Sequence, residues 1–90
     1  MKYRSRVDII AAILEIAKEG SIKTRIMFGA ALSFTQLKEY TTVLIELGLM
    51  ERSEATGLYR TTESGLKFLH MYREIDSMIP EANMLTKIMK

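Results

Sequence analysis

The hydrophobic positions of this 90-residue chain follow a helical spacing over most of its length and change to a strand-like pattern after Gly48. The clearest helix covers residues 33–47, where apolar side chains recur at steps of three and four. These core positions are Leu37, Tyr40, Leu44 and Leu47. Ser33 and Gln36 have the spacing of a capping box at its start, and Gly48 suits the left-handed position after its end. We therefore predict one helix with both ends defined.

Two shorter helices are predicted before it. The first covers residues 6–18, with Ser5 as its N-cap and Asp8 at the position that completes a capping box. Its buried face is expected to hold Ile9, Ile13, Ile16 and Ala17, widened by Ile10 and Leu14. The second helix covers about residues 24–30 and begins with Thr24 as its cap. A short helix, a tight turn and a longer capped helix together form a helix-turn-helix pattern.

The next part of the chain predicts a hairpin followed by a last helix. Residues 49–52 and 58–61 are short strand-like runs, and the polar segment 53–57 ends in Gly, as a five-residue hairpin loop does. Thr62 is expected to cap a helix that starts at Glu63. The predicted fold is therefore mainly α with a small β-hairpin: a winged helix-turn-helix with an extended C-terminal helix.

An apolar row continues along the C-terminal helix at alternating steps of four and three, which are typical of a coiled-coil register. We expect this row to form a homodimer interface, with folding back onto the first helix as the alternative. The predicted interface consists of Phe68, Met71, Tyr72, Ile75, Met78, Ile79, Ala82, Leu85 and Met89. Pro80 removes a helix hydrogen bond, so the helix is expected to break or kink near it. The chain thus divides into a domain of residues 1–65 and a dimerisation helix of residues 66–90.

Composition narrows the classes of function. Apolar residues make up 48% of the chain, and no stretch approaches the roughly 20 apolar residues that span a bilayer. There is no Cys and a single His, and the chain shows neither a nucleophile paired with a base nor a Gly-rich phosphate loop. We therefore predict no enzyme activity, metal site or cofactor, and a cytoplasmic location. The net charge is +2, but residues 1–38 carry +4 and residues 39–90 carry −2, so the first half suits phosphate contacts.

Three stretches of the chain carry motifs that occur together. They are RSRVDIIAAILEIAKEG, KTRIMFGAALSFTQLKEYTTVLIELGLMER and YRTTESGLKFL, which cover about residues 4–69. The LS-x-x-QL cap and the TT-x-x-G-x-x-FL entry to the last helix are among the most specific pieces. As a set, these motifs resemble the archaeal winged helix-turn-helix family of small transcriptional-regulator-like and chromosomal DNA-binding proteins. The resemblance implies a winged-helix fold, duplex DNA binding and dimerisation through the C-terminal helix as an antiparallel coiled coil.

In such a fold the helix over residues 33–47 enters the major groove with its N-terminal half toward the bases. Gln can pair with adenine, Glu can accept from cytosine, and Thr can meet a thymine methyl group. Cations at the start of the second helix and on the hairpin suit phosphates. The predicted DNA-binding residues are Lys23, Thr24, Arg25, Ser33, Thr35, Gln36, Lys38, Glu39, Thr42, Arg52 and Arg60.

The function predicted from these observations is a double-stranded DNA-binding protein that regulates transcription, with chromosome architecture as the second possible role. Its partners would be duplex DNA and a second copy of the chain, without a membrane or a metal, and in an archaeal cell it would lie in the nucleoid. The alternative is a winged-helix module that binds another protein and not DNA. Acidic residues on the would-be DNA side favour this alternative, namely Glu39, Glu46 and Glu54.

Overall fold

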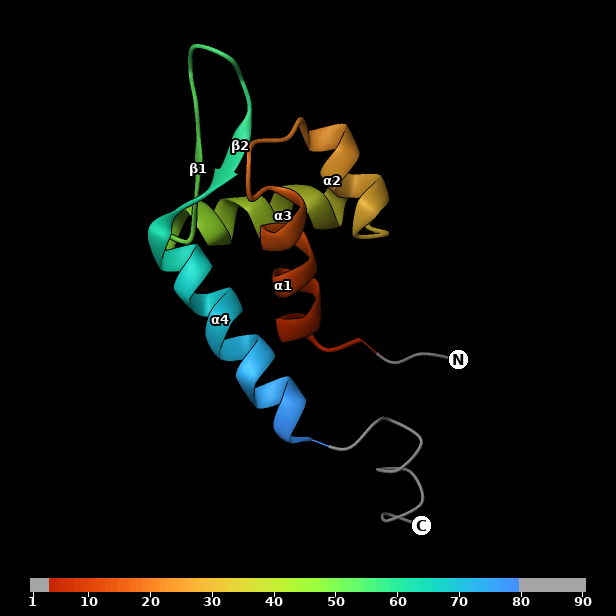
Figure 1. Ribbon diagram of the computed structural model, residues 1–90. Coiled ribbons are helices and arrows are strands. Elements are labelled where there is room, and N and C mark those ends of the chain that lie inside the picture. Colours follow the sequence, from red (N-terminus) through yellow and green to blue (C-terminus); the bar gives the residue numbers. More distant parts are fainter. Residues whose placement is uncertain (1–3, 80–90) are drawn as a thin grey trace.

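The computed structural model describes residues 4–79 and contains the predicted succession of helices and hairpin (Figure 1). The elements are α1 (Arg6–Ile16), α2 (Lys23–Gly29), α3 (Phe34–Glu46), β1 (Met50–Arg52), β2 (Tyr59–Thr61) and α4 (Glu63–Met78). The predicted fold class, mainly helical with a two-stranded antiparallel hairpin, is confirmed. The kink expected at Pro80, the helical segment after it and the interface positions Ala82, Leu85 and Met89 lie outside the described residues.

Local capping chemistry determines where three of the helices begin. Ser5 and Asp8 form the predicted capping box of α1, and Ser33 and Gln36 form that of α3. At the start of α4, the Thr62 hydroxyl accepts a hydrogen bond from the backbone N–H of the residue three positions on, at 3.1 Å. Each cap satisfies backbone donors that a helix start leaves without a partner.

The predicted N-cap of α2 is wrong, and the helix begins one residue before the expected position near Thr24. The helix begins at Lys23, its N-cap is Ile22, and no side chain caps it, so Thr24 does not have the predicted role. The reason is a tertiary contact: Ser21 pairs with Tyr59 of β2 through two backbone hydrogen bonds of 2.8 Å each. Because this bridge fixes the chain just before the helix, the start of α2 does not depend on a capping side chain.

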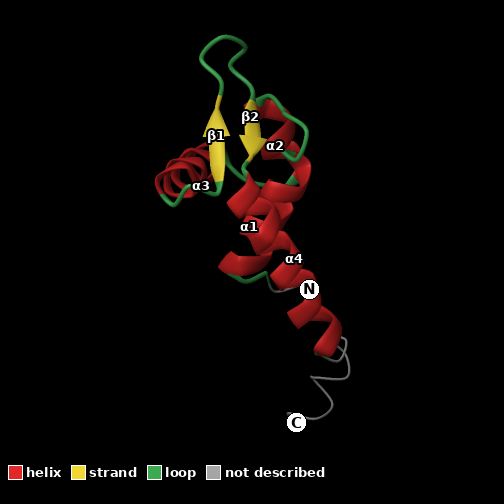
Figure 2. Ribbon diagram, turned by 60° about the vertical axis from the view of Figure 1, so that its left-hand side comes forward, coloured by secondary structure: helices red, strands yellow, loops and turns green. Residues whose placement is uncertain are grey.

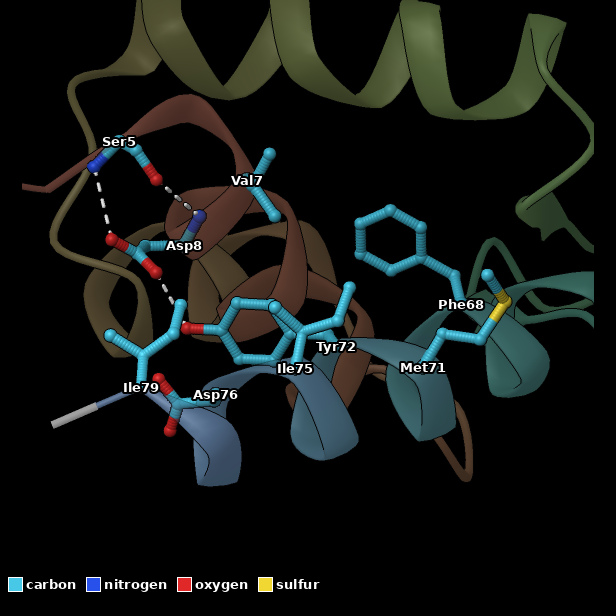
Figure 3. Close-up of a pocket in the computed structure, with 9 residues that line it drawn as sticks. All are labelled: Ser5, Val7, Asp8, Phe68, Met71, Tyr72, Ile75, Asp76 and Ile79. Carbon is cyan, nitrogen blue, oxygen red and sulfur yellow. Dashed lines mark hydrogen bonds between the residues drawn. The ribbon is translucent and has the colours of Figure 1, made fainter.

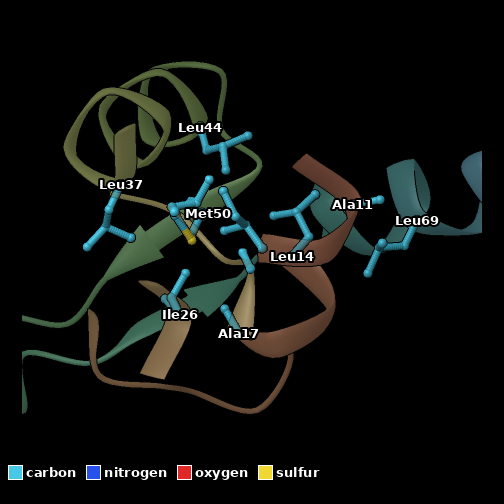
Figure 4. Close-up of a cluster of buried hydrophobic side chains, with 11 residues drawn as sticks. Ala11, Leu14, Ala17, Ile26, Leu37, Leu44, Met50 and Leu69 are labelled. Carbon is cyan, nitrogen blue, oxygen red and sulfur yellow. The ribbon is translucent and has the colours of Figure 1, made fainter. Parts of the chain in front are cut away.

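The core lies where α1 meets the inner faces of the other elements (Figure 4). Its largest fully buried side chains are Ile13, Leu14, Ile26, Leu44 and Met50. Of the residues predicted for the buried face of α1, Ile13, Leu14 and Ala17 are buried, whereas Ile9 and Ile16 are only half-buried. Ala11 is buried although it was not predicted. On α3 the prediction for Leu47 is wrong: it is the C-cap and is exposed. Thr41 is buried in the stripe instead, with its hydroxyl donating to the Leu37 carbonyl at 2.9 Å.

The base of the hairpin is attached directly to α1. The Thr61 hydroxyl donates to the Leu14 carbonyl at 2.6 Å, and the Thr61 backbone N–H donates to the Ala17 carbonyl at 3.0 Å. In the strand register Met50 lies opposite Thr61, and both are buried. The hairpin therefore projects from the core at a fixed place beside α3.

A close approach at Gly65 packs the first turn of α4 against the hairpin. A Cβ atom at this position would overlap the Leu49 carbonyl oxygen and lie 2.5 Å from Thr61 Cγ2. The residue is buried, and the obstructing atom on one side is backbone, which cannot rotate away. The absence of a side chain at Gly65 thus allows α4 to leave the hairpin at its observed angle.

We predict that Gly65→Ala destabilises the protein by about 1–3 kcal/mol through overpacking. An exposed helical Gly→Ala change would instead stabilise by up to about 1 kcal/mol, so the sign of the effect tests the contact. Urea unfolding measures it, with Ser64→Ala as the control because Ser64 is exposed in the same helical turn. Equal or higher stability of Gly65→Ala would contradict the close approach.

Candidate nucleic-acid interface

Helix α3 lies at one edge of the molecule, with the hairpin beside it (Figure 2). Its inner face is held in the core by Leu37, Thr41 and Leu44. The opposite face carries exposed side chains at steps of four, three and four. These outer residues are Thr35, Glu39, Thr42 and Glu46. The predicted hydrophilic face of the helix is thus presented to solvent.

A groove of about 360 Å³ separates α3 from the hairpin and the start of α2. It is lined by Lys23, Phe34, Leu37, Lys38, Thr41, Thr42, Ile45 and Tyr59. Both charged side chains in this set are lysines, one from α2 and one from α3. The Lys23 Nζ lies 5.5 Å from the centre of the Phe34 ring, within the range of a cation–π contact. The groove therefore combines positive charge with an apolar floor.

The two arginines of the hairpin lie on opposite faces of it. Arg52 is paired with Tyr59 in the strand register, and its guanidinium lies 5.9 Å from the centre of the tyrosine ring. Because Tyr59 also lines the lysine groove, Arg52 is on the groove side. Arg60 lies opposite Glu51 on the other face, since successive strand residues alternate in direction. Arg52 thus shares a hairpin face with Tyr59, which lines the groove, whereas Arg60 lies on the opposite face.

A second hollow, of about 420 Å³, lies between α3 and α1 and contains two of the residues predicted to contact bases, Gln36 and Glu39. It is lined by Arg6, Ile10, Gln36, Glu39, Tyr40 and Val43. The Gln36 Oε1 accepts from the Ser33 backbone N–H at 2.9 Å, and the Ser33 hydroxyl accepts from the Gln36 N–H at 3.1 Å. The capping box therefore occupies the Gln36 carbonyl and leaves its side-chain N–H groups for other partners.

The structure separates two cations that the sequence analysis placed together. Lys23 lines the groove beside α3, whereas Arg25 lines a different hollow with Glu15, Lys18 and Glu19. Thr24 is exposed between them and, as described above, does not cap the helix. The two cations at the start of α2 therefore lie on different surfaces. The surface that holds Lys23 borders α3, and the one that holds Arg25 does not.

Comparison with known proteins agrees with this arrangement of helices and hairpin. A sequence model described as winged helix-turn-helix matches residues 3–80. The chain belongs to this family.

A relative and a solved structure extend the comparison. An uncharacterized protein of Methanocaldococcus jannaschii is 36% identical over 73 residues, which are 80% of this chain and 73% of that protein. The crystal structure of Sso10a-2, a DNA-binding protein from Sulfolobus solfataricus, superposes on this chain with a TM-score of 0.73 at 21% sequence identity. That match covers 83% of this chain and 81% of the other. At this identity the superposition establishes a shared fold.

One residue of this winged helix-turn-helix protein was missed by the sequence analysis. Phe34, the first residue of α3, is 60% exposed and borders the lysine groove. A signal for it exists in the sequence, since Phe34 directly follows the Ser33 cap and falls outside the stripe of positions 37, 40 and 44. An apolar residue at this first helical position has no place in the core face, so its exposure could have been inferred.

The apolar row on α4 is divided between two environments (Figure 3). Phe68 and Tyr72 are half-buried toward α1, as the folding-back alternative expects. Their neighbours remain exposed, by fractions between 47% and 81%: Met71, Ile75, Met78 and Ile79. Together with Val7 of α1, most of these residues line a trough of about 300 Å³. The family fold thus buries one side of α4 and leaves an apolar strip on the other.

Other kinds of site are limited by what the described residues contain. Within residues 4–79, no group of three or more His, Asp or Glu side chains can hold a metal ion. None of the helices in that range combines the length and hydropathy needed to cross a membrane. His70 is exposed, with its Nε2 at 3.4 Å from a Glu74 carboxylate oxygen one helical turn away. It is therefore part of the helix surface.

A hydrogen bond joins α4 to the capping box of α1 (Figure 3). The Tyr72 hydroxyl donates to Asp8 Oδ1 at 2.6 Å, while Asp8 Oδ2 accepts from the Ser5 backbone N–H at 3.1 Å. The bond from Tyr72, followed by that from Ser5, lowers the pKa of the Asp8 carboxyl below its ordinary 3.8. The same bond raises the pKa of Tyr72 to about 12. Both shifts stabilise the folded state in which Asp8 is charged and Tyr72 is neutral.

We predict that Tyr72→Phe lowers the free energy of unfolding by about 1 kcal/mol at pH 7, where the hydrogen bond is fully formed. In the wild type this contribution is present above the unfolded pKa of Asp8 and is lost as the pH falls through its lower folded pKa. It is also lost above pH 10, because Tyr72 ionises more readily in the unfolded chain. The stability difference between wild type and variant should therefore shrink at both pH extremes.

Urea unfolding at pH 7 and at pH 2 measures the acid side of this prediction. Tyr40→Phe is the matched control, because Tyr40 is also half-buried and its hydroxyl makes no hydrogen bond to another described residue. A difference between wild type and Tyr72→Phe that stays constant from pH 7 to pH 2 would contradict the role of Asp8.

Proposed function

We propose that this protein binds double-stranded DNA with α3 in the major groove and the hairpin on the adjoining backbone. The observation that carries the proposal is the groove beside α3, whose charged lining side chains are both lysines. Arg52 lies next to it, with its guanidinium against the ring of Tyr59, which lines the groove. The structural neighbour Sso10a-2, which is titled a DNA-binding protein, supports it through the shared fold. The proposed role is that of a transcriptional regulator.

Lys23, Lys38 and Arg52 position the protein on the DNA backbone in this proposal. Lys23 and Lys38 neutralise phosphates of the strand that passes between α3 and the hairpin, and Arg52 lies along the same backbone or enters the minor groove. The Ser33 hydroxyl hydrogen is free to donate to a phosphate oxygen while its oxygen caps the helix. Arg25 and Arg60 face other surfaces and, with Thr24, contribute peripheral contacts only.

The outer face of α3 supplies the groups that meet base edges. Thr35 lies in the first turn of the helix, and N-terminal residues of a recognition helix contact bases in this kind of docking. Glu39 and Thr42 follow one and two turns later on the same face. The Thr42 hydroxyl donates to the Lys38 carbonyl at 2.8 Å, which leaves its oxygen and methyl group for the bases. Gln36 contributes its N–H groups from the flank.

A second candidate function is supported by the acids on the same face. Glu39 and Glu46 are exposed on the outer side of α3, where they add negative charge to the face that would enter the DNA groove. A winged-helix module that binds a basic protein surface would use these carboxylates directly. Binding to duplex DNA at low salt distinguishes the two functions, because only the first requires it.

We predict that Lys23→Ala and Lys38→Ala together reduce the slope of log affinity against log salt concentration by about 1.8, since each phosphate contact contributes about 0.9. Gel shifts with random-sequence duplex at several salt concentrations measure the slope. Lys67→Ala, which removes an exposed cation from α4, is the control and should leave it unchanged. No binding by the wild type at low salt would favour the protein-binding module, and an equal loss in the control would remove the groove from the proposal.

We further propose that two copies of the chain associate through the exposed strip on α4. Met71, Ile75 and Met78 are spaced by four and three residues and stand exposed beside the Val7 trough. A contact of this strip with its own copy is isologous, which is the commonest arrangement in homodimers. Each recognition helix would then meet one half-site, with centres about 34–36 Å apart if both face the same side of the duplex.

We predict that Ile75→Glu with Met78→Glu converts the dimer to a monomer, because two charges would be buried in an apolar contact. Sedimentation equilibrium measures the mass of the wild type and the variant. Ser77→Glu is the control, since Ser77 is exposed on the same turn of α4 but points away from the strip. A monomeric wild type, or a double variant with the mass of a dimer, would remove this interface.

A further inference from the structure

An exposed aromatic ring lies at the start of α3, outside the hydrophobic core. Phe34 is 60% exposed, although it is the first residue of the helix proposed to enter the DNA. Its ring borders the lysine groove rather than the hydrophobic core. Single apolar side chains are often exposed on protein surfaces, so what distinguishes Phe34 is its place at the start of α3 and beside two lysines.

The surroundings of Phe34 indicate the chemistry of that partner. Lys23 Nζ lies 5.5 Å from the ring centre, and Lys38 lines the same groove, so the ring is bordered by positive charge. An occupant must therefore present both negative charge and an apolar group within a few ångströms. Duplex DNA does so in its major groove, where phosphates border the base edges and thymine carries a C5-methyl group.

We propose that Phe34 contacts the thymine C5-methyl group and gives this protein a preference for thymine in the major groove. The inference rests on the proposed DNA binding and adds to it a residue that determines specificity. N-terminal residues of a recognition helix lie nearest the base edges, and among those edges the methyl group of thymine is the apolar one. Lys23 holds the ring from one side while its ammonium group neutralises a phosphate of the same strand.

The test compares two pools of random-sequence duplex that differ only in this methyl group. One pool is synthesised with thymidine and the other with deoxyuridine, which keeps every hydrogen-bonding group of the base. The wild type should bind the thymidine pool about fourfold more tightly for each methyl group it buries. Phe34→Ala should lose about fourfold of this preference, and Phe34→Leu should lose less because it keeps an apolar side chain.

The matched control is Phe28→Ala, which removes an aromatic ring that is 74% exposed on the last turn of α2 and does not line the groove. It should retain the full preference for thymidine. Thermal unfolding of each variant establishes that it is folded, and the comparison of the two pools by the wild type needs no variant at all.

The outcomes separate this inference from the proposed function. If the wild type binds neither pool at low salt, DNA binding itself fails. If it binds both pools equally, or if Phe34→Ala retains the difference, DNA binding stands and the methyl contact is wrong. If the two pools bind equally and a circular-permutation gel shift detects a bend in the bound DNA, Phe34 would act as a wedge between base pairs. This result would also overturn the methyl contact.

Discussion

The attachment of the hairpin to α1 is the constraint on which the proposed interface depends. A two-stranded hairpin is marginally stable alone, and this one is held by backbone and side-chain hydrogen bonds from Thr61 to α1 and by the bridge between Ser21 and Tyr59. These contacts place Tyr59 across the groove from α3. Without them Lys23 and Lys38 would lie on the open surfaces of α2 and α3, and the groove would lose the wall that the hairpin forms.

The same small core leaves the protein with two exposed candidate binding surfaces on different elements. Helix α4 packs on α1 through Leu69, Phe68 and Tyr72. Met71 and Ile75 lie on the other side of the helix, where the core does not cover them. A domain of this length buries only about 60% of its unfolded surface, so an apolar strip on its last helix is expected to find a partner outside the protomer. The α3 groove and the α4 strip then serve different contacts.

The predictions that succeeded rest on chemistry within a few residues of the chain. The capping pairs Ser5 with Asp8 and Ser33 with Gln36 were predicted because their groups meet within one helical turn. The start of α2 was misplaced because a strand residue 38 positions beyond Ser21 fixes it. Likewise, nothing local to Gly65 reveals that a backbone carbonyl lies against it. Contacts between distant segments decided these positions.

In the candidate site, too, some features could be predicted from the sequence and others depend on contacts between distant segments. That Thr35, Glu39 and Thr42 share a face follows from helical spacing, and the structure leaves this face exposed. Residues two positions apart on a helix point to different sides, so the spacing of Lys23 and Arg25 could have separated them. Which of the two borders α3 depends on how α2 is rotated against the core, which Ile26 fixes by its burial, and the spacing alone could not show this.

The separation of charges on α3 gives the proposed complex a defined orientation. Lys38 lies on the flank toward the hairpin, whereas Glu39 and Glu46 lie on the outer face. In the major groove the N-terminal turn and the outer face of a helix approach the bases, and the flanks of its later turns approach the phosphate strands. The acids then lie away from the phosphates, and Glu39 can accept a hydrogen bond from a cytosine amino group. A rotated helix would direct the acids at the backbone, so their repulsion disfavours incorrect docking.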